Sequence, residues 1–299
     1  MTKYIIIFGA GASFGSDTSN TPPLGSDLFS ALQQFNPDGW GKIDGELADS
    51  FQSDFEGAMT SVNPHALPPL QRAMAAYFFR FQPTQNSLYY KLARLLSQKT
   101  WNGAFVTLNY ERLLEISLSA AGIQPFIGNA TNHTNPIELC IPHGACHIFC
   151  QAVRGSAQGI SFSGPNVTTN GPVEVIANPQ NFQDRITTDA FPPVMSYFEP
   201  SKRTTSGANF IESQRKRYDD LVNNAEKIVI IGLRVRGHDK HIWEPLSKTK
   251  ANLIYCSGNT AGEEFKEWRN QKRSEKGDKI LTQYFDESFD ELVRELGLN

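Results

Sequence analysis

Residues 4–13 read Tyr4-Ile5-Ile6-Ile7-Phe8-Gly9-Ala10-Gly11-Ala12-Ser13 and combine an apolar half with a glycine-rich half. Its first half is a short apolar run rich in β-branched side chains, which is typical of a strand buried on both faces of a parallel sheet. Its second half is small and rich in glycine, so the backbone can turn sharply where the strand ends. Together the two halves predict the first strand–turn–helix unit of an α/β protein.

Further apolar runs along the chain are expected to be strands of the same sheet. They are Ala104–Leu108, Ile137–Ile141, Val173–Ile176, Lys227–Ile231, Asn252–Cys256 and Lys279–Tyr284. Helical patterns lie between many of them, such as the apolar stripe that contains Leu88, Leu92 and Leu95. This alternation predicts the fold class, an α/β protein with a Rossmann-like, doubly wound parallel sheet.

Two stretches interrupt the alternation. Residues 36–86 are rich in Phe, Ala, Pro and Gln and predict a helical insertion, with a break at Pro68–Pro69. Residues 151–171 are rich in Gly, Ser, Asn and Thr and predict a long surface loop that folds over a ligand. The 299 residues fit one large α/β domain, so we expect residues 1–299 to form a single domain that carries the insertion.

The charge balance argues against some classes of partner. A net charge of −3 and a pI near 6.1 give no electrostatic reason to expect strong binding to nucleic acid or to a membrane. The apolar run Tyr4–Phe8 is too short for the core of a signal peptide. No run approaches the length that spans a bilayer, so we expect a cytoplasmic protein.

The cysteines allow a metal site but do not favour one. They are Cys140, Cys146, Cys150 and Cys256, without a Cys-x-x-Cys pair, and in a reducing cytosol they are most simply buried thiols. The alternative is a zinc site formed by Cys146, Cys150, His143 and His147. Because this spacing matches no common zinc module, we expect no metal.

Small and polar residues gather where five of the predicted strands end. The segments are Gly9–Ser13, Thr107–Glu111, Pro142–Gly144, Ile231–Arg234 and Cys256–Asn259. The carboxyl ends of parallel strands meet at one edge of the sheet, where open α/β sheets bind their ligands. One shared pocket explains the five segments better than five separate structural features do.

Three of these segments also have a structural interpretation. The glycine turn can cradle a pyrophosphate or allow tight packing of strand and helix, and Gly15 falls one position late for a Gly-x-Gly-x-x-Gly motif. Asn109 can hold a ligand or cap the following helix. His143 can be a structural histidine, although Gly144 behind it is expected to leave its ring uncrowded in a cleft.

The ordered set of segments resembles the sirtuin superfamily. Gly9–Ser13 is similar to its opening phosphate-binding motif, and Thr107–Glu111 is similar to its Thr-x-Asn-x-Asp element. Pro142–Gly144 resembles the catalytic His-Gly. Gly232 resembles the glycine of its later Gly-x-Ser motif, and Ser257–Asn259 resembles the segment that holds the adenosine end.

The departures from the family pattern narrow the resemblance. Glu111 stands where the family has Asp, and Arg234 stands where it has Ser. Sirtuin deacylases carry two Cys-x-x-Cys pairs after the His-Gly, whereas this chain has only Cys146 and Cys150 there. The closer resemblance is to bacterial sirtuin-like effectors of antiviral defence, which destroy NAD and are often fused to a sensor domain.

The resemblance implies that NAD is a substrate and that its nicotinamide–ribose bond is cleaved. It implies His143 as general base, Asn109 as the residue that holds the ribose hydroxyls and the attacking water, and Glu111 near the carboxamide of nicotinamide. The remaining implied contacts are Gly9, Ala10, Gly11, Ala12 and Ser13 at the phosphates, and Gly232, Arg234, Ser257 and Asn259 at the adenosine half.

We therefore expect an NAD hydrolase that releases nicotinamide and ADP-ribose. The alternatives are a non-catalytic module that senses NAD or ADP-ribose and, less favoured, a protein deacylase. An unregulated hydrolase would kill its own cell, so we expect a homo-oligomer and a separate activating partner, such as a hexameric ATPase of the DNA-translocase type. The Phe and Pro content of residues 36–86 suggests an exposed contact surface there.

Overall fold

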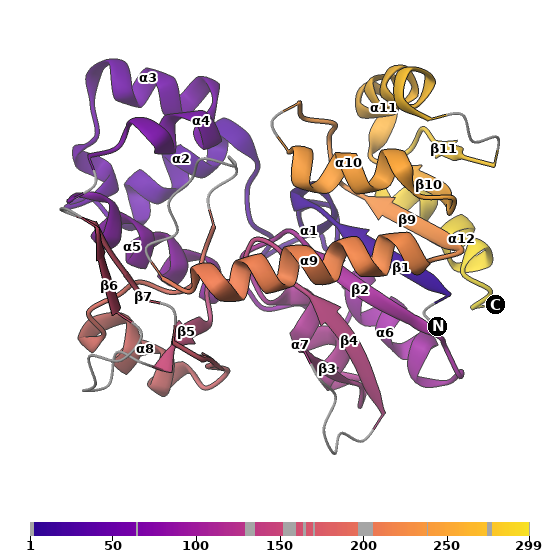
Figure 1. The fold of residues 1–299 in the computed structure, drawn as a ribbon, viewed down its shortest axis with the longest axis horizontal. Coiled ribbons are helices and arrows are strands. Elements are labelled where there is room, and N and C mark those ends of the chain that lie inside the picture. Colours follow the sequence, from indigo (N-terminus) through magenta and orange to yellow (C-terminus); the bar gives the residue numbers. More distant parts are fainter. Residues whose placement is uncertain are drawn as a thin grey trace.

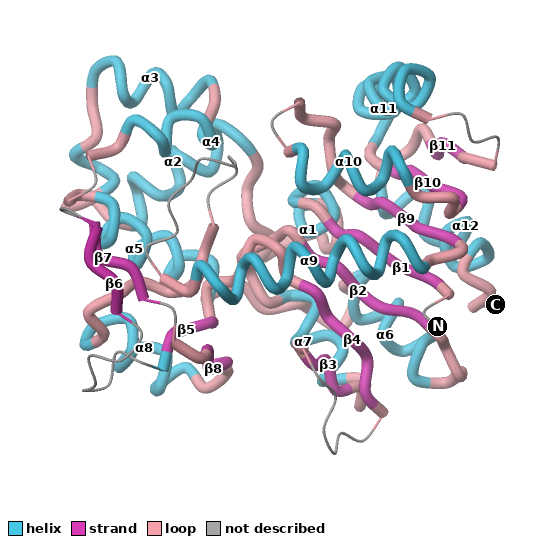
Figure 2. The backbone as a smooth tube through the Cα atoms, viewed as in Figure 1, coloured by secondary structure: helices cyan, strands magenta, loops and turns pink. Residues whose placement is uncertain are grey.

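The computed structural model describes residues 3–63, 65–128, 135–151, 160–163, 166–169, 171–196, 206–237, 239–273 and 277–298. A seven-stranded parallel sheet forms its centre, in the order β11-β10-β9-β1-β2-β4-β3 (Figure 1 and Figure 2). Its strands are β1 (Tyr4–Phe8), β2 (Gly103–Thr107), β3 (Gln124–Phe126), β4 (Pro136–Cys140), β9 (Lys227–Ile231), β10 (Asn252–Cys256) and β11 (Lys279–Leu281). The predicted Rossmann-like α/β fold is confirmed.

The strand β1 lies where the direction of winding changes. The chain first places β2, β4 and β3 on one side of β1 and later places β9, β10 and β11 on the other. Phe8 is level with Thr107 of β2 and with Ile231 of β9, so the carboxyl ends of these three strands meet. Ligands of open α/β sheets bind beside such a switch point, and Gly9–Ser13 follows it directly.

Helices cover both faces of the sheet (Figure 1). One face carries α9 (Ala208–Asn224), α10 (Lys240–Lys248) and α11 (Gly258–Lys272), and the other carries α6 (Leu88–Ser97), α7 (Leu113–Ala120) and α12 (Phe285–Glu295). Ile5 and Ile7 of β1 pack towards α9, α10 and α11, whereas Ile6 and Phe8 pack towards α6, α7 and α12. All four side chains are fully buried, which explains the unbroken apolar run of β1.

One predicted strand does not belong to the main sheet. β8 (Val173–Val175) pairs antiparallel with β5 (Ile148–Cys150) in a separate two-stranded sheet, so the expectation for Val173–Ile176 is wrong. Val175 is 52% exposed. A short run of β-branched residues suits a half-exposed strand as well as a buried one, so the composition of this run did not distinguish the two. The main sheet instead gains β3, an edge strand that the apolar pattern does not mark.

The helical insertion begins earlier than predicted. Its helices are α2 (Gly25–Phe35), α3 (Gly45–Ser53), α4 (Phe55–Ala58) and α5 (Leu67–Phe79), with 3-10 turns at Trp40–Lys42 and Met59–Ser61. Because α2 contacts α3, α4 and α5, the insertion extends back from residue 36 to residue 25. Pro68 and Pro69 lie in the first turn of α5, where a proline needs no hydrogen-bond partner, so they begin a helix and do not break one.

The aromatic residues of the insertion pack against one another. Phe29 and Phe51 stack with 5.0 Å between ring centroids, and Trp40 packs edge-on against both. The phenylalanines between residues 36 and 86 are Phe51, Phe55, Phe78, Phe79 and Phe81, and all of them are buried. The expectation that they form an exposed contact surface is therefore wrong, because they lie on the inner faces of the packed helices.

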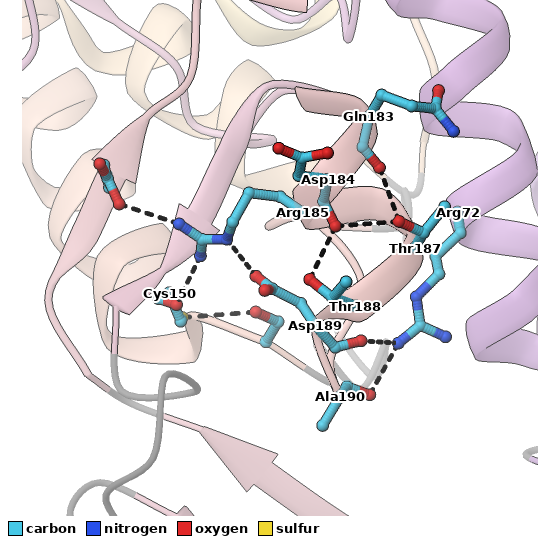
Figure 3. Close-up of polar contacts among 11 residues, drawn as sticks. Arg72, Cys150, Gln183, Asp184, Arg185, Thr187, Thr188, Asp189 and Ala190 are labelled. Carbon is cyan, nitrogen blue, oxygen red and sulfur yellow. Dashed lines mark hydrogen bonds and ion pairs between the residues drawn. The ribbon is translucent and has the colours of Figure 1, made fainter. Parts of the chain in front are cut away.

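Two arginines, Arg185 and Arg72, hold the start of the segment that precedes α9, and Arg72 joins it to the insertion. Arg185 of α8 (Pro179–Thr188) is 1% exposed and forms ion pairs with Asp189 and, at 2.9 Å, with Glu174. Figure 3 shows these contacts and, beside them, Arg72 of α5 pointing towards the backbone carbonyls of Asp189 and Ala190. These bonds anchor the start of the segment that runs from Asp189 to Ser196.

The predicted loop over residues 151–171 lies partly outside the described residues. Within it, β6 (Ile160–Ser163) and β7 (Asn166–Thr169) pair with each other in antiparallel fashion. Among the described residues, none of the helices is both long and apolar enough to cross a membrane.

Candidate functional site

The glycine turn after β1 packs tightly against the loop after β9. Gly9 donates its backbone N–H to Ile231 and Gly11 donates its backbone N–H to Gly232, both at 2.9 Å. A Cβ at Gly9 would lie 2.5 Å from the carbonyl oxygen of Gly232. Close packing of two backbones therefore explains the small residues at 9 and 11, which is the structural interpretation of this motif. Ala10, at the start of the short helix α1 (Ala10–Phe14), is exposed.

Ser13 is the centre of a buried hydrogen-bond network. Its hydroxyl donates to Glu111 at 2.5 Å and accepts from the side-chain amide of Asn109 at 2.8 Å. Tyr89 of α6 shares a 2.9 Å hydrogen bond with the same hydroxyl. Since a serine hydroxyl carries one proton and two lone pairs, Tyr89 is the donor, and Ser13 is fully satisfied. The network joins the ends of β1 and β2 to α6.

Asn109 does not cap the helix that follows β2, whereas Glu111 bonds to the first residue of that helix. α7 begins at Leu113, and the Asn109 amide donates to Gly9 and Ser13, so the capping interpretation of Asn109 is wrong. Glu111 accepts the backbone N–H of Leu113 at 2.5 Å and thereby serves the start of that helix. Burial raises the pKa of Glu111, while its bonds to Ser13 and Leu113 oppose that rise.

A second set of buried titratable groups lies on and beside α7. Burial raises the pKa of Glu115 to about 8 and lowers the pKa of His147 to about 3. Their contact of 3.9 Å is therefore between two neutral groups at neutral pH and is not an ion pair. Arg112 lies 3.6 Å from the ring centroid of Phe79 and donates to the carbonyl of Ala177. The contact between Arg112 and Phe79 places the start of α7 against the insertion.

His143 follows β4 but does not lie in an open cleft. It is 1% exposed, so the expectation of an uncrowded ring is wrong. Gly144 has a φ of +73°, and a Cβ there would lie 2.0 Å from the carbonyl oxygen of Val194. Ser196 donates its backbone N–H to the carbonyl of His143 at 2.8 Å. The glycine thus admits the segment Asp189–Ser196 against the backbone of His143.

The side chain of His143 meets a second histidine that the sequence argument missed. The Nε2 atoms of His143 and His241 are 2.8 Å apart. His241 is the second residue of α10 and follows the predicted strand-end segment Ile231–Arg234. A histidine a few residues beyond such a segment was the available signal. Tyr89 was also missed, because it sits inside an apolar helical stripe whose pattern predicts only core packing.

The residues expected at the adenosine half are less closely grouped. Gly232 has a φ of +65° and packs against the glycine turn. Ser257 precedes α11 and is partly buried, whereas Asn259 lies within α11 and is exposed. Arg234 extends to Glu264 of α11 in a largely exposed ion pair.

The structure therefore brings together part of the predicted set. Gly9, Ser13, Asn109 and Glu111 form one bonded group, and Gly232 packs against it. The backbone of Cys146 donates to Tyr110 at 2.9 Å, which places the His143 segment beside the Asn109 segment. Over the described ranges, His, Cys, Asp and Glu side chains form no group that could hold a metal ion.

Comparison with models of known protein families gives no match for this chain. The curated proteins likewise contain none that matches it.

Proposed function

We propose that this protein hydrolyses NAD to nicotinamide and ADP-ribose, and that it acts as an effector that depletes NAD in defence against phage. The observation that carries the proposal is the bonded group of Gly9, Ser13, Asn109 and Glu111 at the switch point of the sheet, with His143 on the neighbouring strand end. The resemblance to sirtuin-like effectors supplies the reaction, and the position of the group agrees with it.

In this proposal the protein mainly orients its substrate. Cleavage of the nicotinamide–ribose bond leaves positive charge on the ribose, as in glycoside hydrolysis, and the leaving group needs little acid assistance. Asn109 holds the ribose hydroxyls and the attacking water, and His143 accepts the proton of that water. Glu111 acts indirectly: it holds the hydroxyl of Ser13, and that hydroxyl holds the side-chain amide of Asn109.

Access to the site requires movement in this proposal. Asn109 is 7% exposed and His143 is 1% exposed, so a dinucleotide can reach them only when neighbouring segments shift. Such a closed resting form suits an enzyme that is held inactive until a homo-oligomer or an activating partner, such as a hexameric ATPase, opens it. Phe14 stands next to Ser13 and is 51% exposed, which makes it a candidate contact for that partner.

The burial of Asn109 and His143 also favours a second candidate function. A module that senses NAD or ADP-ribose without cleaving it needs no open path for water to these residues. The two functions differ in one observable, because a sensor binds NAD and releases it unchanged.

The experiment is to incubate the purified protein, alone and with its genomic neighbours, with NAD and to separate the products by chromatography. We expect nicotinamide and ADP-ribose from the wild type and none from His143→Gln. The matched control is His65→Gln, which changes an exposed histidine of the insertion and should retain full turnover. Binding of NAD without loss in any assembly would favour the sensor, and a cyclic product would replace hydrolysis by cyclisation.

A further inference from the structure

The contact between His143 and His241 has the geometry of a proton-transfer pair. Their Nε2 atoms are 2.8 Å apart, and their ring centroids are 5.0 Å apart at an interplanar angle of 51°. At this distance one nitrogen donates and the other accepts, so a single proton lies between the two rings. Neutral imidazole and imidazolium interconvert near physiological pH, which suits histidines to proton transfer.

His241 also reaches a hollow on the surface. This hollow has a volume of about 270 Å³ and lies between α9 and α10. Its lining residues are Arg215, Asp219, Asn223, Lys240, His241, Glu244, Pro245 and Lys248. His143 is not one of them. His241 therefore lies between the buried His143 and a hollow at the surface.

The hollow is lined by carboxylates, which can accept a proton, and by positively charged side chains, which repel one. Asp219 and Glu244 contribute carboxylates, and Glu244 lies 3.8 Å from Lys248. Arg215 and Lys240 contribute positive charge, and Asp239 directly precedes α10. Arg215 also donates to the hydroxyl of Ser196, whose backbone bonds to His143. Positively and negatively charged side chains from α9 and α10 thus surround His241 at the hollow.

Hydrolysis of NAD creates a need for such a connection. NAD and water give nicotinamide, ADP-ribose and one proton, because the positive charge of the pyridinium ends on the proton that water loses. In the proposed function that proton passes to His143. Because His143 is 1% exposed, it cannot pass this proton directly to bulk solvent. The proton must nevertheless leave His143 before the next turnover.

We infer that His241 relays this proton from His143 to the hollow between α9 and α10. The inference rests on the proposed hydrolase function. As the water oxygen bonds to C1′ of the ribose, the bond from C1′ to nicotinamide breaks and leaves its electron pair on the nicotinamide nitrogen. Nε2 of His143 takes the proton from that water and becomes part of an imidazolium.

The second half of the relay uses the described arrangement. When the His143 side chain lies against His241, its Nε2 proton passes to Nε2 of His241, which enters the step with its own proton on Nδ1. The His241 ring then turns so that Nε2 faces the hollow and releases the Nε2 proton to solvent there, while the proton on the buried Nδ1 is kept, so both rings are neutral and His241 is ready for the next turnover. His241 acts through His143 and does not touch the substrate, so it is a positioning and relay residue.

The test compares His241→Ala with the wild type in the active assembly. We expect kcat for NAD to fall about ten-fold or more while KM changes less than about two-fold, because proton removal limits turnover and NAD binding does not involve His241. Added imidazole should enter the vacated space and restore most of kcat. Pyrazole has the same shape but is a far weaker base, and it should restore little.

The outcomes separate the relay from the function on which it rests. If His241→Ala keeps the wild-type kcat, or if pyrazole restores it as well as imidazole does, His241 only fills space and the relay is wrong. If the wild type consumes no NAD in any assembly, the hydrolase proposal is wrong and the relay falls with it. His65→Ala, at an exposed site, serves as the control and should respond to neither additive.

Discussion

The side-chain amide of Asn109 lies 2.8 Å from the hydroxyl of Ser13, and this hydrogen bond joins residues 96 positions apart in the sequence. Both residues are buried; Ser13 lies in the short helix α1 that follows β1, and Asn109 lies in the loop that follows β2. The bond fixes the end of β2 relative to the glycine turn after β1. Asn109 therefore shapes the candidate site as well as lining it.

A double-mutant cycle measures this relationship. Asn109→Ala and Ser13→Ala should each lower the free energy of unfolding, and the pair should show a coupling energy of about 1 kcal/mol because they share one buried hydrogen bond. Urea unfolding of the four proteins supplies the numbers. Strictly additive effects would mean that the bond contributes nothing to the fold. NAD turnover should be lost in Asn109→Ala whatever the size of the coupling.

Gly232→Ala should destabilise the fold. Gly232 has a φ of +65°, and a Cβ there would lie 1.8 Å from the backbone nitrogen of Ala12, so strain and a backbone clash act together. We expect a loss of about 2 kcal/mol or more in the free energy of unfolding. Gly237→Ala is the matched control, because a Cβ at Gly237 meets nothing within 4 Å. Equal stability of the two variants in thermal unfolding would contradict the described packing.

Glu115 should make the folded protein less stable as the pH rises. In the unfolded chain its pKa lies near 4.5, whereas burial raises it to about 8 in the folded protein. Between these values the folded protein holds the extra proton, so the free energy of unfolding falls with increasing pH. His147 has the opposite effect, but only below its ordinary pKa of 6.5, because its folded pKa is lowered to about 3.

The window from pH 6.5 to pH 8 isolates Glu115 from His147. Across it, Glu115→Gln should gain up to about 2 kcal/mol of stability relative to the wild type, since glutamine does not titrate. Urea unfolding at both pH values gives the comparison. Glu267→Gln changes an exposed glutamate, and its difference from the wild type should stay constant. A constant difference for Glu115→Gln as well would show that Glu115 is ionised in the folded protein.

Arg185→Met should be far more damaging than Arg217→Met. Arg185 is 1% exposed and leaves Asp189 buried without its charge partner when it is replaced, which costs about 3–5 kcal/mol. Arg217 is 42% exposed in its pair with Glu138, so its replacement should cost about 1 kcal/mol or less. Denaturant melts compare the two. A mild Arg185→Met would mean that the segment Asp189–Ser196 is anchored by other contacts.

Local patterns were sufficient for most strands of the main sheet and for the bonded group of Gly9, Ser13, Asn109 and Glu111 at its edge. The runs that became β1, β9 and β10 are buried on both faces, so composition alone marked them. Asn109 was found because it follows such a run. Val173–Ile176 has a similar composition, but its pairing with β5 depends on partners that the run itself does not specify.

The parts that could not be predicted depend on contacts between distant residues. A glycine is required at position 144 because the carbonyl of Val194, fifty positions later, packs against it. The residues next to Gly144 in the sequence do not indicate that contact. His241 contacts His143 only because α10 packs beside the end of β4, and the sequence near His241 does not indicate that packing. The aromatic residues of the insertion were predicted to be exposed because the sequence does not show how their helices pack against one another.

The central position of β1 has a consequence for synthesis of the protein. β1 leaves the ribosome before the other strands of the main sheet, yet its partner β9 ends at Ile231. Until that residue emerges, one edge of β1 has no partner, and the glycine turn lacks the carbonyls of Ile231 and Gly232 that hold Gly9 and Gly11. The candidate site is therefore completed only after Ile231 and Gly232 have been translated. A nascent chain that stalls earlier carries an open, apolar strand edge and no working site.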